Sequence, residues 1–165
     1  MTDRPSSLAT EDVVTPVAVV LHHAQFSDRY LDDEELAALD EQAPYDLDLA
    51  LARLSPLHLS VALTFVAGEG FPYTLAIQYV VDFEMSESVP EDRRDEVWRD
   101  AASRWAPAIL YPYVRELATN LTARWIDAPL VLPLVPETLG YGPEDLEIPP
   151  PPTGDGSEAT PEKIG

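Results

Sequence analysis

Few residues in this chain could do chemistry, and their spacing does not suit catalysis. The sequence has no cysteine and three histidines, His22, His23 and His58. Neighbouring residues of a strand point to opposite faces, so His22 and His23 do not chelate one ion together. Asp46 and Asp48 share one face of an expected strand, but paired acids on a hydrated strand are more often solvated than catalytic. Because the sequence contains no nucleophile elbow and no phosphate loop, we expect that the protein is not an enzyme and has no metal site and no cofactor.

Acidic residues dominate the charge of the chain. The 165 residues include 30 acids and 10 bases, a net charge of -20, and residues 28–48 hold nine acids against the single base Arg29. This balance disfavours nucleic acid and anionic membrane surfaces as partners and leaves basic polypeptides as candidates. Solubility or a salty habitat would explain the acidity equally well.

The ends of the chain differ from its middle. Residues 1–12 are polar and acidic and lack the features of a signal peptide, and no run is long and apolar enough to span a membrane. We therefore expect a cytoplasmic protein without membrane insertion. Residues 148–165 begin with a proline-rich run and continue with the composition of a flexible linker. The predicted organisation is a disordered lead over 1–12, one domain over 13–147, and a disordered tail over 148–165.

Alternating apolar residues predict strands through the first half of the domain. Residues 13–26 are rich in β-branched and aliphatic residues, with Pro16 suited to a sheet edge or a bulge. Apolar side chains then occupy odd positions around 45–51, 57–65 and 73–85. Short connections at 55–56 and 67–70 favour antiparallel order, and a sheet with one apolar face needs a covering layer.

That covering layer is a helix predicted from about Pro90 onward, with its main part over 106–127. Apolar residues recur every four positions and form one row of a wide stripe. This row comprises Trp105, Ile109, Tyr113, Leu117, Leu121 and Trp125. Ala106, Leu110, Val114 and Ala118 form a second row beside it. Pro112 lies inside the pattern, where it removes a main-chain hydrogen bond, so we expect a kink near 108–112.

Beyond the helix the chain is predicted to be extended. Leu130, Leu132 and Leu134 alternate with prolines, which cannot donate regularly to a ladder. Residues 137–147 contain two glycines and a proline, so any second helix is short and interrupted.

Two strings resemble the SecB family of export chaperones. PAILYPYVREL, residues 107–117, is followed after about ten residues by APLVLPLVP, and the paired prolines make the match specific. The resemblance extends back to YTLAIQYVVDFEM and YDLDLALARL and covers roughly 17–135. It implies an α+β fold, a four-stranded antiparallel sheet covered by a long Pro-kinked helix. The chain departs from the family in its second C-terminal helix, which is expected to be short or absent.

The resemblance also implies a homotetramer, a dimer of dimers joined through the long helices, and grooves that bind clients. The implied oligomer contacts are Trp105, Ile109, Tyr113, Leu117 and Leu121. The implied client contacts are Leu36, Leu39, Tyr45, Phe65, Tyr73, Leu132 and Leu134.

The function implied is that of an ATP-independent holdase that binds unfolded polypeptides, such as preproteins for export, and docks on the translocase motor ATPase. His23, Ser27 and Ala76 stand where the family often carries acids that dock this motor. Two alternatives therefore stay open. One is a specialised SecB-like chaperone dedicated to one partner such as an antitoxin. The other is an oligomeric SecB-like scaffold or adaptor that binds one partner without chaperone activity.

Overall fold

The computed structural model describes residues 10–29, 32, 34, 45–68, 70–123, 130–134 and 143–152. Leu36 and Leu39, two of the implied client contacts, lie outside these residues. Most of the predicted lead and most of the predicted tail also lie outside them.

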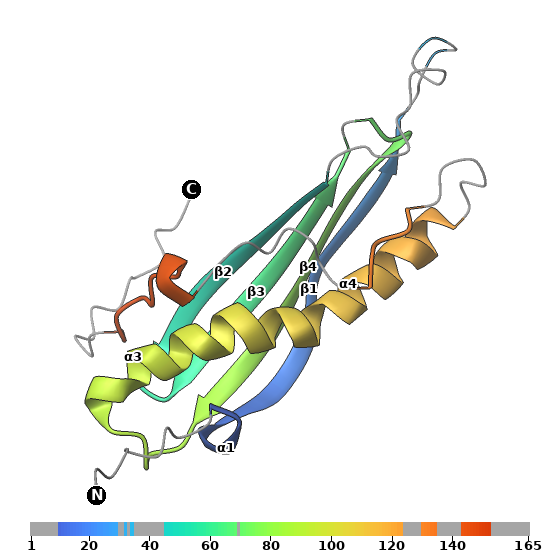
Figure 1. Ribbon diagram of the computed structural model, residues 1–165. Helices are drawn as coiled ribbons and strands as arrows, with labels where there is room; N and C mark the ends of the chain where they lie inside the picture. Colours follow the sequence, from blue (N-terminus) through green and yellow to red (C-terminus); the bar gives the residue numbers. More distant parts are fainter. Residues whose placement is uncertain are drawn as a thin grey trace, which may run out of the picture.

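Four strands form one antiparallel sheet, in which β1 and β2 are the edges (Figure 1). They are β1 (Val14–Asp28), β2 (Tyr45–Ser55), β3 (His58–Ala67) and β4 (Tyr73–Met85), in the order β1-β4-β3-β2. A single helical turn, α1 (Thr10–Val13), precedes β1. The four-stranded antiparallel sheet expected from alternation and short connections is confirmed.

The strand register places the apolar residues on one face. Leu51, Val61, Val81 and Val19 lie in one row across all four strands. The odd-numbered residues of β3 from Leu59 to Phe65 are fully buried, because this face packs under the helical layer. We call it the inner face.

Pro16 lies where a strand tolerates proline. It belongs to edge strand β1, and the pairing with β4 shifts register between Pro16 and Ala18. Because Pro16 has no N–H to donate, the edge and the irregularity let it enter the strand without breaking a ladder between two neighbours.

One long helical region covers the inner face (Figure 1). It consists of α3 (Glu91–Asp100), a π-helical turn η1 (Ala101–Trp105) and α4 (Ala106–Thr122). The irregular hydrogen bonding comes at η1, where the Ala106 N–H donates to the Ala101 carbonyl, earlier than the kink expected from Pro112. Pro112 itself lies inside α4 with its side chain exposed. Among the described residues no helix is long and apolar enough to cross a membrane.

After α4 the described chain has one helical element, the three-residue 3-10 turn η2 (Pro143–Asp145). The expectation of a short or absent second helix is confirmed for these residues. Leu130, Leu132, Leu146 and Ile148 are nonetheless buried in the same core as the sheet. Ile148 begins the predicted tail, so the first residue of that segment packs on the domain.

Candidate functional site

The helix leaves the two edges of the inner face partly uncovered. Helix α4 contacts mainly β4 and β3, the two central strands. The inner face of each edge strand therefore forms an apolar border beside α4. We call them the β1 margin, centred on Val19, Leu21 and Phe26, and the β2 margin, centred on Tyr45, Leu49 and Leu51.

The β1 margin carries part of the stripe expected to join subunits. The ring of Tyr113 lies 5.5 Å from the ring of Tyr79 on β4, and Tyr79 pairs with Leu21. Tyr113 is 46% exposed, and Leu21 is exposed to a similar extent. The other stripe residues are half-buried against the core. These are Trp105, Ile109, Leu117 and Leu121.

The second row of the helix, not the stripe, faces the centre of the sheet. Ala106, Leu110, Val114 and Ala118 are fully buried. The apolar surface of α4 is therefore wider than the part that contacts the sheet, and the remaining apolar part lies beside the free edge of β1.

The β2 margin has an aromatic end and an aliphatic middle. The rings of Tyr45 and Phe65 lie 5.4 Å apart, with Phe65 fully buried and Tyr45 half-buried above it. Leu49 and Leu51 continue the margin and are half-buried. An extended chain placed along β2 would meet these side chains at every second residue.

Residues 130–134 run beside α4 with alternating burial. The Leu130 N–H donates to Thr122 Oγ1 at 3.0 Å, and the Tyr111 hydroxyl donates to the Pro133 carbonyl at 2.9 Å. Leu132 is buried, while Leu134 is 81% exposed. At about 100° per residue, Tyr111 projects from α4 well away from Tyr113. This segment and the stripe therefore lie on different sides of the helix.

Tyr73 occupies the interior of the sheet. Its ring lies 5.5 Å from Phe26 and 5.4 Å from Phe71, and its side chain is fully buried. Burial raises the pKa of Tyr73, an effect reduced by its hydrogen bond to the Thr122 side chain.

The implied client contacts thus separate into three groups. Phe65, Tyr73 and Leu132 are enclosed in the core of the single chain. Tyr45 is half-buried and Leu134 is exposed, so these two are open to a partner. Leu36 and Leu39 lie outside the described residues.

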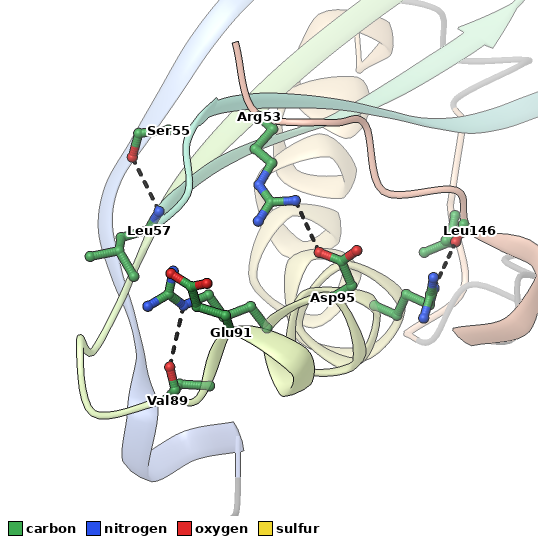
Figure 2. A network of polar contacts seen from close by, with 9 residues as sticks. Arg53, Ser55, Leu57, Val89, Glu91, Asp95 and Leu146 are labelled. Carbon is green, nitrogen blue, oxygen red and sulfur yellow. Dashed lines mark hydrogen bonds and ion pairs between the residues drawn. The ribbon is translucent and has the colours of Figure 1, made fainter. Parts of the chain in front are cut away.

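A serine, a histidine and a glutamate meet at the β2–β3 turn. Ser55 Oγ lies 2.8 Å from His58 Nδ1, and His58 Nε2 lies 3.6 Å from Glu84 Oε1. Ser55 Oγ also accepts the Leu57 N–H at 3.2 Å (Figure 2), so it closes the turn. His58 and Glu84 are about half exposed, and we assign the group a structural role. Within the described ranges, no group of histidine and carboxylate residues could hold a metal ion.

A polar network fixes α3 over the end of β2 (Figure 2). The Arg53 side chain is 7% exposed, and its Nη1 lies 2.9 Å from Asp95 Oδ1. Arg94 Nε donates to the Val89 carbonyl at 3.2 Å, and Arg99 Nε to the Leu146 carbonyl at 3.3 Å. Sequence reasoning missed Arg53, although the alternation of β2 signalled it: an odd position there points inward.

The comparisons with known proteins address the fold. No family model and no curated protein matches the chain. Among solved structures, the SecB-like chaperone Rv1957 of Mycobacterium tuberculosis, in complex with a ChAD peptide from the Rv1956 HigA1 antitoxin, matches with a TM-score of 0.56 and 20% identity. The match covers 76% of this chain and 89% of that one.

The chain has a SecB-like fold. The resemblance read from the proline-containing strings is confirmed at the level of the fold. A protein of unknown function from Streptococcus agalactiae also matches, with a TM-score of 0.43 and 18% identity over 73% of this chain and 97% of that one.

Proposed function

We propose that this SecB-like protein is an ATP-independent chaperone that holds extended, unfolded polypeptide segments along the β2 margin. The observation that carries the proposal is a row of half-buried apolar side chains on an edge strand, with exposed Leu134 on the segment beside α4. The SecB-like neighbour, itself a chaperone solved with a bound peptide, supports this assignment.

The physical basis is non-directional burial along an edge. An unfolded segment exposes apolar side chains at short intervals, and each Å² that Tyr45, Leu49 and Leu51 help to cover contributes about 25 cal/mol. As an edge strand, β2 also has main-chain groups that can pair with an added strand. Neither interaction depends on the client's particular sequence, so many clients fit.

Assembly would use the β1 margin. The stripe residues lie beside the free edge of β1, and Tyr113 is partly exposed there. A second copy of the chain packed on this border would bury the apolar part of α4 that does not contact the sheet. We therefore propose a homotetramer, a dimer of dimers, whose several margins raise the avidity for one long client.

We propose that the chain is specialised for a short segment of one partner, such as part of an antitoxin. This client class is preferred to preproteins in general. The neighbour holds an antitoxin peptide. On this chain the positions of His23, Ser27 and Ala76, on β1 and β4, carry no acids with which to dock a motor ATPase. The net charge of -20 favours client segments that are basic.

An oligomeric adaptor is the second candidate. It is favoured by the burial of Phe65, Tyr73 and Leu132, which leaves less open apolar surface than the resemblance implied. An adaptor would bind one partner tightly and would not protect unrelated proteins.

Aggregation assays separate the two functions. Several unrelated proteins are diluted from denaturant without ATP in the presence of stoichiometric amounts of the chain. Broad suppression of light scattering supports the chaperone. Inertness towards all of them, together with one tight partner, supports the adaptor and overturns the chaperone proposal.

A further inference from the structure

Thr122, the last residue of α4, has a hydroxyl that connects three parts of the fold. Among the described serines and threonines, only Thr122 is fully buried. Its Oγ1 donates to the Ala118 carbonyl at 2.9 Å and accepts the Leu130 N–H at 3.0 Å. The Tyr73 side chain on β4 forms a hydrogen bond with the same hydroxyl. A hydroxyl has one proton and two lone pairs, so these three bonds use its full capacity.

Residues 130–134, which we call the presenting segment, are held near both ends. The Thr122 hydroxyl binds the main chain at Leu130, and the Tyr111 hydroxyl donates to the Pro133 carbonyl at 2.9 Å. Figure 1 shows this segment beside the second half of α4. The two hydrogen bonds, together with the two buried leucines of the segment, fix its path along the helix.

The presenting segment carries the two most exposed large aliphatic side chains of the described chain. Val131 is 78% exposed and Leu134 is 81% exposed, and the next is Leu54 at 58%. A single exposed aliphatic residue is ordinary on a protein surface. Here two of them lie close together on a main chain that is already held in place, so a partner that covers them loses little conformational entropy in ordering it.

We propose that Thr122 is a positioning residue for client capture. It holds the presenting segment so that Val131 and Leu134 together contact an aliphatic stretch of an extended client. This role rests on the proposed function and adds Val131 to the residues that contact the client. The segment and the stripe assigned to subunit assembly lie on different sides of α4, so a client is the expected occupant here, ahead of a second copy of the chain.

The role of Thr122 is indirect, because its side chain is buried and acts through the Leu130 N–H. Without the hydroxyl, this N–H would lose its acceptor inside the core. A buried donor without a partner is costly, so the start of the presenting segment would move towards water. Val131, the next residue, would move with it and would no longer be held beside Leu134.

The test measures the Kd for one unfolded client by fluorescence anisotropy. The probe is labelled ribonuclease A, reduced and with its thiols blocked so that it stays unfolded. Thr122→Val keeps the shape of the side chain and removes the hydroxyl, and it should weaken the Kd about tenfold, the effect of uncovering one aliphatic side chain. Thr122→Ser keeps the hydroxyl and should restore most of the affinity.

Thr119 provides a matched control in the same helix. Its Oγ1 donates to the Arg115 carbonyl at 2.8 Å, four residues back as for Thr122, but its side chain is exposed. Thr119→Val should therefore leave the Kd unchanged. Equal affinities of Thr119→Val and Thr122→Val would overturn the proposal.

A double-mutant cycle separates positioning from stability. Val131→Ser with Leu134→Ser changes two exposed side chains and should also weaken the Kd by about tenfold or more. Adding Thr122→Val to this pair should cause little further loss, because Thr122 acts through these side chains. A merely structural role would lower the urea midpoint and leave the two effects on the Kd additive, and additive losses overturn the proposal.

Hydrogen exchange tests the link to the presenting segment directly. Thr122→Val should speed exchange of the Leu130 amide by about tenfold, and Thr119→Val should not. Unchanged exchange at Leu130 contradicts the positioning role.

The remaining outcomes distinguish this role from the chaperone function. If the serine pair at 131 and 134 lowers the mass measured by light scattering, a second copy covers the segment and the proposal is overturned. If the unmodified chain and Thr122→Val bind the probe equally well, the role of Thr122 is refuted and the chaperone stands. If the unmodified chain captures no client while the Leu130 amide still depends on Thr122, the chaperone is refuted, and the role of Thr122 in capture is refuted with it.

Discussion

The ion pair between Arg53 and Asp95 allows a sharp test of how α3 is held on the sheet. Their side chains are 7% and 52% exposed, and Nη1 and Oδ1 lie 2.9 Å apart. Asp95→Ala leaves a buried guanidinium without this carboxylate. Breaking a fully buried pair costs about 3 to 5 kcal/mol. Because Asp95 is half exposed, we expect about 1.5 to 3 kcal/mol, the range for a hydrogen bond to a charged group.

The opposite substitution should be much milder. Arg53→Met removes the buried charge together with Nε, which is buried and has no partner among the described residues. Removing one partner of an ion pair is costly when the charge left behind is buried. Here the remaining carboxylate of Asp95 is half exposed and stays hydrated. We expect a change below about 1 kcal/mol, and little further loss when Asp95→Ala is added to Arg53→Met.

Urea unfolding followed by circular dichroism measures these free energies. The matched control is Arg93→Gln, which breaks the ion pair of Arg93 with Glu96 at 2.7 Å on the exposed side of the same helix. An exposed pair contributes about 0 to 1 kcal/mol. The reasoning is refuted if Asp95→Ala costs no more than the control, or if Arg53→Met costs as much as Asp95→Ala.

Three further predictions concern pH, client capture and assembly. Because burial raises the pKa of Tyr73 above the ordinary tyrosine value of 10.0, the folded chain keeps this proton to a higher pH than the unfolded chain. The stability that this proton contributes is present below pH 10 and is lost as the pH rises further. Tyr73→Phe should therefore reduce the decrease of the urea midpoint with rising pH above about 10, and an unchanged decrease would contradict this assignment. Leu134→Asp should weaken the suppression of client aggregation several-fold. The control Leu54→Asp, at an exposed site at the far end of β2, should leave it unchanged. Equal effects of the two substitutions would exclude Leu134 from the client surface. Tyr113→Asp should lower the mass measured by light scattering without changing the circular dichroism spectrum, and an unchanged mass would exclude Tyr113 from the subunit contact.

Much of the fold could be predicted because local periodicity is sufficient for it. Alternation with a period of two located β2, β3 and β4, and the short turns implied their antiparallel order. Pro16 indicated an edge or a bulge, and β1 provides both. The four-residue repeat located the helix over the sheet. These signals depend on neighbours a few residues apart, which a sequence shows directly.

The candidate site was harder to predict because burial depends on partners far along the chain. Phe65 and Tyr73 are implied client contacts by resemblance, and in the single chain both side chains are fully buried. Two apolar rows on α4 looked equivalent in the sequence, and only packing determined that the row of Leu110 faces the sheet while the row of Tyr113 lies on its border.

By itself, the sequence determined the strands, the helix and the acidity, and it predicted that any helix after α4 would be short, as it is in the part of the chain that the structure describes. Only the tertiary structure decided that Arg53 lies beneath α3 and that Ile148, assigned to the tail, returns to the core with Leu146. The physical reason is that periodicity shows which side of an element is apolar. It does not show which distant segment will cover that side, because this depends on the free energy of competing contacts across the whole chain.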